Sequence, residues 1–120
     1  MEDLNSILEE YDILYAFLAD FANGKIREFG DRNLLAFQDI VNQHFGSEQS
    51  VLNLKAHLDE SILPQTVRQG KVCCVLTKPD SEKVIGLFFH DEGDLLARRR
   101  KAKDLDKAVK DAFGSSGDCV

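Results

Sequence analysis

The sequence predicts an α+β domain in which helices sandwich a single five-stranded, mostly antiparallel sheet. Two apolar runs of strand length, 72–77 and 84–89, flank a turn at Pro79-Asp80, which is typical of an antiparallel pair buried on both faces. An uninterrupted apolar run at 13–19 supplies another strand. Helical spacing elsewhere gives the order helix, two strands, one or two helices, three strands, helix.

The first element is expected to be a short helix, because its apolar residues recur every three or four positions. These residues are Leu4, Ile7, Leu8 and Tyr11. The run 13–19 then forms a strand in the middle of the sheet. Asn23-Gly24 predicts a hairpin with a type I′ turn, since both residues tolerate a positive φ. The return strand at 25–29 is polar, which favours an edge of the sheet.

Two helices are expected between residues 31 and 58. Asp31 or Asn33 is predicted to cap the first, and Gly46 to end it. Its apolar stripe consists of Leu34, Phe37, Ile40, Val41 and Phe45. Ser47 can cap a second helix that runs to about Leu58. One long kinked helix is the alternative, but glycine followed by serine favours a stop and a restart.

The last part of the chain allows two interpretations. Residues 65–68 are predicted to form a strand that follows Pro64. After Phe89, residues 91–101 either begin a long helix over 95–113, capped by Asp91 or Asp94, or form a hairpin that precedes a shorter helix. The long helix is favoured, because this segment is rich in helix formers. We expect one domain over 1–113 and a flexible tail over 114–120.

Composition limits the partners and the setting. The chain has 120 residues and a formal net charge of −6, which disfavours both nucleic acid and anionic lipid as partners. No apolar stretch approaches the roughly 20 residues of a membrane span, so no membrane insertion is expected. Cys73, Cys74 and Cys119 lack the spacing of a disulfide framework or a zinc site. A cytoplasmic protein is the expectation.

A search for catalytic and metal-binding patterns finds none of them convincing. The glycines match no phosphate-binding loop, and no serine lies in a nucleophile elbow. His44 and His57 stand too far apart in sequence for a metal-binding helix. The run from His90 to Glu92 could hold a divalent cation, but a solvated strand end explains it more simply. We therefore expect no catalytic residue, no metal, no cofactor and no enzyme activity.

One basic cluster breaks the acidic pattern. It consists of Arg98, Arg99, Arg100 and Lys101. The cluster is either a docking patch for an acidic surface or a phosphate, or a solvated helix face whose charge is offset by neighbouring aspartates. With helices expected mainly on one side of the sheet, the other face would need a cover, often a second copy of the chain.

The order of elements resembles the Roadblock family of dynein light-chain-related proteins, which share a profilin-like layout. The first hairpin, Ile13 to Asp20 with Asn23-Gly24-Lys25-Ile26, is similar to that family's apolar strand followed by aspartate and a glycine turn. The segments Gly70 to Leu76 and Val84 to Phe88 are similar to its closing strands. The region from Asp31 to Leu58 departs from the family's usually simpler second helix.

This resemblance implies a non-enzymatic dimer, joined through the second helix and the third strand, that binds a small Ras-like GTPase or scaffolds a larger complex. Related proteins act on the GTPase's own site, so the chain would need no catalytic residue. The implied interface residues are Leu34, Phe37, Ile40, Val41, Val67 and Val72.

A small-molecule sensor of the PAS type is the alternative. Such a domain would hold its ligand between sheet and helices near Phe17, Cys74 and Phe88.

Overall fold

The computed structural model describes residues 4–36, 38–60, 64–91 and 93–113. The predicted tail at 114–120 and Cys119 lie outside these residues. The helices are α1 (Leu4–Tyr11), α2 (Asp39–Phe45), α3 (Glu48–Asp59) and α4 (Leu95–Phe113), with a 3-10 turn η1 (Arg32–Leu34). The strands are β1 (Tyr15–Asp20), β2 (Lys25–Gly30), β3 (Gln65–Gln69), β4 (Val72–Thr77) and β5 (Lys83–His90).

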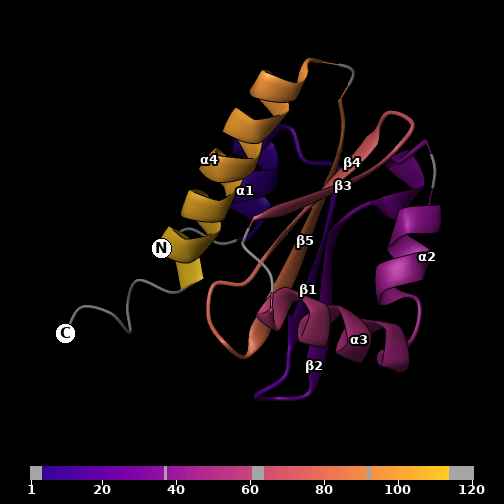
Figure 1. Cartoon of the computed structure of the whole chain (residues 1–120), viewed down its shortest axis with the longest axis vertical. Coiled ribbons are helices and arrows are strands. Elements are labelled where there is room, and N and C mark those ends of the chain that lie inside the picture. The colour runs from indigo at the N-terminus through magenta and orange to yellow at the C-terminus, as the bar shows by residue number, and fades with distance from the viewer. Residues whose placement is uncertain (1–3, 37, 61–63, 92, 114–120) are drawn as a thin grey trace.

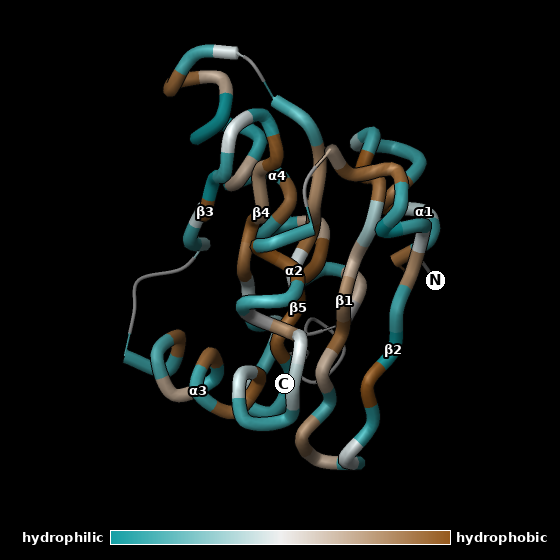
Figure 2. The backbone as a smooth tube through the Cα atoms, turned by 90° about the vertical axis from the view of Figure 1, so that its right-hand side faces the viewer, coloured by the Kyte–Doolittle hydropathy of each residue, from teal (hydrophilic) through white to brown (hydrophobic). Residues whose placement is uncertain are grey.

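The strands form one five-stranded sheet in the order β2-β1-β5-β4-β3, and every neighbouring pair is antiparallel. Strand β5 lies at the centre, while β2 and β3 lie at opposite edges (Figure 2). The predictions of a central first strand and a polar edge strand β2 are therefore confirmed. The predicted α+β class and element order are confirmed as well.

Helices cover both faces of the sheet. Helices α1 and α4 lie on one face, and α2 and α3 lie on the other (Figure 1). The expectation that one face would need a second copy as its cover is wrong. The reason is that residues 31–58 fold into two helices, which together are wide enough to bury that face.

Strands β4 and β5 are apolar between their end residues, and each packs against both helical layers. Under α4, the buried residues Ile85 and Phe89 meet Leu105 and Val109. On the opposite face, Phe88 belongs to a cluster with α2 and α3. The run of consecutive apolar residues in each strand thus follows from burial on both sides.

Helix ends follow their local sequence at two of the predicted points. Ser47 accepts a hydrogen bond from the Ser50 backbone N–H at 3.1 Å and caps the start of α3. The prediction of two helices is thereby confirmed, and the alternative of one long kinked helix is wrong. Asp94 accepts from the Ala97 N–H at 2.8 Å at the start of α4. The long helix is thereby confirmed, and the alternative hairpin over residues 91–101 is wrong.

The predicted start of the second helix is wrong. Asp31 accepts from the Asn33 N–H at 2.9 Å, but it caps only η1. Leu35 is extended and buried, and the Ala36 N–H donates to His90 Nε2 at 2.9 Å. These tertiary contacts stop the helix, and α2 begins only at Asp39.

The first hairpin also differs from the prediction. Asp20 pairs with Lys25, which leaves a four-residue loop in place of the two-residue type I′ turn. Gly24 has a φ of +65°, whereas Asn23 does not adopt a positive φ. The Asp20 carboxylate accepts from the N–H groups of Ala22 and Asn23 and from the Asn23 side chain. These bonds to Asn23 lower the pKa of Asp20 and explain the longer loop.

A close contact on the central strand attaches α2 to the sheet. The Phe45 ring lies with its centroid 4.0 Å from that of Phe17 and 5.9 Å from that of Phe88. It sits directly over Gly86, where an added Cβ would lie 2.8 Å from Phe45 Cζ. Real Cβ atoms do not approach so closely. Any residue other than glycine at position 86 would therefore displace the Phe45 ring.

We expect Gly86→Ala to lower the free energy of unfolding by about 1 kcal/mol, because the new methyl group displaces the Phe45 ring. Urea unfolding followed by circular dichroism measures this loss. In a Phe45→Leu background the same substitution should cost clearly less, since the clashing ring is gone. Equal costs in the two backgrounds would show that Gly86 has no special relation to Phe45.

Candidate protein-interaction surfaces

The described residues hold no reactive or metal-binding cluster. No group of three or more histidine, cysteine or acidic side chains is placed to bind a metal within the parts of the chain that the structure describes. Cys73 and Cys74 are fully buried, and burial raises the pKa of both thiols. His90 accepts a backbone hydrogen bond, and Glu92 lies outside the described residues. The most concentrated polar groups thus serve the fold.

The site proposed for a sensor ligand is filled by side chains around Cys74 and Phe88. Phe17, Cys74 and Phe88 are all buried in the cluster under α2 and α3. The Phe88 ring also lies 5.5 Å from that of Tyr15, whose hydroxyl donates to Glu28 Oε1 at 2.5 Å. Close aromatic packing of this kind leaves little room for a ligand beside Phe88. Phe17 and Tyr15 also border an open hollow of about 310 Å³ between the first hairpin and α2.

The residues implied as an interface fall into two groups. Ile40, Val41 and Val72 lie in the core of the single chain. Leu34 is 56% exposed, and Val67 is half-buried on β3. The Phe37 side chain lies outside the described residues. Only part of the implied stripe is therefore available at the surface.

The corner between β3 and α2 is the surface that this stripe borders. Strand β3 pairs with β4 on one side only, so its other edge is open in the single chain. Gln69 Nε2 donates to Asp39 Oδ2 at 3.0 Å and joins the end of β3 to the start of α2. Gln69 Oε1 is buried and has no hydrogen-bond partner among the described residues. An open strand edge of this kind can pair with another chain.

The basic cluster does not form one patch. Arg98 and Arg99 line a groove between α4 and β3. Lys101 Nζ lies 4.1 Å from the centre of the Phe89 ring, and Arg100 is exposed but does not line the groove. Successive residues on a helix point in different directions, which divides the four charges.

Two features of the surface were not predicted from the sequence. The groove beside α4 also includes Lys103 and the exposed Leu95, which no periodic pattern connects with strand β3. The second feature is a hollow of about 100 Å³ between the first hairpin and α3. Exposed leucines at the start of α4 were the one available signal for the groove.

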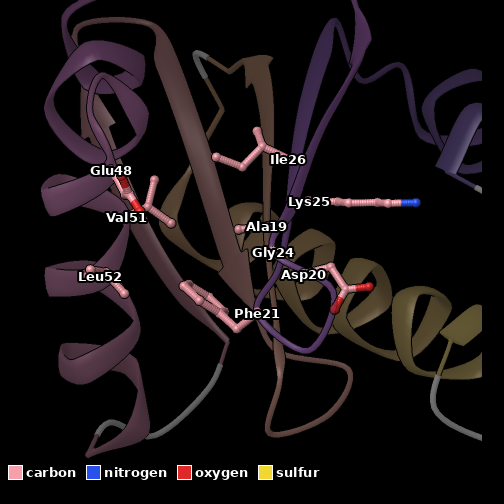
Figure 3. Close-up of a pocket in the computed structure, with 9 residues that line it drawn as sticks. All are labelled: Ala19, Asp20, Phe21, Gly24, Lys25, Ile26, Glu48, Val51 and Leu52. Atoms are coloured by element: carbon pink, nitrogen blue, oxygen red, sulfur yellow. The ribbon is translucent and has the colours of Figure 1, made fainter.

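The hollow is apolar and small. Phe21 and Ile26 of the hairpin face Val51 and Leu52 of α3, while Lys25 points away (Figure 3). A ligand site usually measures several hundred Å³, so this hollow is too small for most cofactors. Its exposed members, Ile26 and Leu52, make it an apolar notch on the surface.

No helix in the described parts of the chain has both the length and the apolar character that a membrane span requires.

Comparison with known proteins gives no match by sequence and several by structure. No protein-family model matches the chain, and no curated protein matches it. The structure is similar to MglB of Myxococcus xanthus, with 18% identity, a TM-score of 0.54, and coverage of 92% of this chain and 91% of MglB.

Two further solved structures are similar. MglC of Myxococcus xanthus has 13% identity and a TM-score of 0.50, over 84% of this chain and 87% of MglC. A Roadblock/LC7 domain from Streptomyces avermitilis has 14% identity and a TM-score of 0.51, over 93% of this chain and 98% of that domain. At these identities the likeness concerns the fold, and it confirms the fold resemblance predicted from the sequence.

Proposed function

Because the chain has the Roadblock/LC7 fold, we propose that it is a non-enzymatic, dimeric regulator that binds a small Ras-like GTPase or scaffolds a larger complex. The resemblance seen in the sequence implies such a role, since Roadblock proteins accompany small Ras-like GTPases. The observation that carries the proposal is this fold combined with an open edge strand β3 beside α2. A regulator of this kind acts by contact, which agrees with the buried thiols and structural histidine described above.

The dimer is proposed to form through β3 and α2, most simply about a two-fold axis that pairs each β3 with its copy. Leu34, Phe37 and Val67 would then contact the second copy directly. Ile40, Val41 and Val72 are buried in the single chain, so their part is to hold α2 and β4 beneath the interface. A cytoplasmic setting remains part of this proposal.

Leu34→Glu should weaken the dimer, because it places a charge where an apolar side chain is proposed to be buried. Sedimentation over a range of protein concentrations should give a dissociation constant about ten-fold higher or more. Ile26→Glu is the matched control, since Ile26 is 55% exposed and Leu34 is 56% exposed. Ile26 lies on the opposite edge strand, so its substitution should leave the dimer unchanged.

A wild-type chain that remains monomeric at the highest concentrations would contradict the dimer. Equal weakening by Leu34→Glu and Ile26→Glu would mean that a general loss of solubility or fold, and not this surface, controls association. Circular dichroism of both variants separates these two causes.

The GTPase role is tested by hydrolysis. GTP turnover by a Ras-like GTPase of the same organism should change several-fold when the chain is added in excess, although the chain itself hydrolyses no GTP. Ile26→Glu should keep this effect, and Leu34→Glu should reduce it in proportion to the lost dimer. If the chain binds no Ras-like GTPase of that organism and changes the GTP turnover of none, the GTPase role is wrong. The proposal that the chain scaffolds a larger complex would then be the one that stands.

A further inference from the structure

A groove of about 440 Å³ runs between the open edge strand β3 and helix α4. Thr66 of β3 forms one wall, and Leu95 and Ala102 give the α4 wall its apolar part. Leu95 is 55% exposed and Leu96 is 68% exposed, whereas Ala102, Leu105 and Val109 further along α4 are buried. All the residues that line the groove belong to a single chain, and one wall is the strand β3 that the proposed dimer would pair.

The charge along this groove is positive, in contrast to the net charge of −6 of the chain. Among the described residues, the lining includes Arg98, Arg99 and Lys103 and no carboxylate. Arg68 pairs with Cys73 and therefore lies on the α4 face of β3, but it does not line the groove, and its Nε donates to the Gly70 carbonyl at 2.8 Å. Burial raises the pKa of the Cys73 thiol and the charge of Asp91 raises it further, whereas the charges of Arg68 and Arg98 lower it.

Among the described residues, no carboxylate forms an ion pair with Arg98, Arg99 or Lys103. The Asp94 carboxylate accepts from the Ala97 N–H, and the Asp91 carboxylate accepts from the Gly93 N–H at 2.7 Å. Arg98 Nη1 donates to the Gly93 carbonyl at 2.7 Å. Because a guanidinium has five N–H donors, this bond leaves most of them for another acceptor.

The geometry points to a docking site for an extended acidic segment of a partner protein, whose carboxylates meet Arg98, Arg99 and Lys103 and whose apolar residue covers Leu95. The cations span residues 98–103, which at 1.5 Å per residue is about 7.5 Å of helix. That span suits two or three carboxylates along an extended chain better than one isolated anion. The exposed leucine supplies an apolar contact that a simple ion would not use.

Other anionic partners fit the groove less well. A bilayer surface is flat, whereas these cations line a concave groove, and the overall acidic charge would oppose approach to an anionic membrane. Single-stranded nucleic acid is bound through aromatic stacking as well as charge, and the described residues of the lining include no aromatic side chain. An acidic peptide that also carries an apolar residue matches both the cations and the exposed leucine of the groove.

The test uses the full chain and a fluorescein-labelled peptide made of glutamates with leucine at every third position. Fluorescence anisotropy should show saturable binding at roughly 50 mM salt that weakens strongly by roughly 300 mM. Arg99→Glu should raise the dissociation constant about five- to ten-fold. Arg100→Glu is the matched control, since it is exposed, adjacent and equal in charge change but lies outside the groove lining.

Leu95→Asn should weaken binding several-fold while leaving the salt dependence unchanged, because it removes only the apolar contact. A peptide with glutamine in place of glutamate should not bind. All three substituted positions are at the surface, so circular dichroism and the mass in solution should match the wild type. Weakened peptide binding with an unchanged mass separates this site from the proposed dimer.

Three results would overturn the inference. Equal losses for Arg99→Glu and Arg100→Glu would indicate general attraction between charges. Absence of binding at low salt would exclude an acidic-peptide site. Tighter binding to phosphatidylserine vesicles than to the peptide, lost in Arg99→Glu, would assign the groove to a lipid surface instead.

Discussion

The contact between the Phe45 ring and the backbone at Gly86 is the constraint on which the rest of the structure depends. It holds α2 on the central strand, and α2 with α3 closes one face of the sheet while α1 and α4 close the other. With both faces covered, only strand edges and the outer surfaces of helices remain for contact with other molecules. The architecture itself therefore directs function to the surface.

Polar side chains in the described structure mostly serve folding. Asp59 accepts hydrogen bonds from Lys78 and Lys55, which lower its pKa and join α3 to the end of β4. The Thr77 hydroxyl is buried and donates to Asp106 of α4. The cations on the α4 side of the groove differ from these, because no described carboxylate forms an ion pair with Arg98, Arg99 or Lys103. This contrast separates a candidate docking surface from structural charge.

Sequence patterns predicted the strands, because burial on both faces requires unbroken apolar runs such as 72–77 and 84–89. They also predicted the start of a second helix at Ser47, because the Ser47 hydroxyl accepts from the N–H of Ser50, only three residues along the chain. They failed where distant parts of the chain decide the local conformation. The hydrogen bond between Ala36 and His90 joins residues 54 positions apart in the sequence. It helps to place the start of α2 at Asp39, which local capping patterns do not predict. The groove was missed for the same reason, since Thr66 and Lys103 meet only in the folded chain.

The central proposal is that this chain works by contact through its open edge at β3. Amide hydrogen exchange measured at low and high protein concentration tests it, with edge strand β2 as an internal reference. The account predicts that amides of β3 exchange more slowly as concentration rises, while those of β2 keep the same rate. Exchange in β3 that stays as fast as in β2 at every concentration would contradict it.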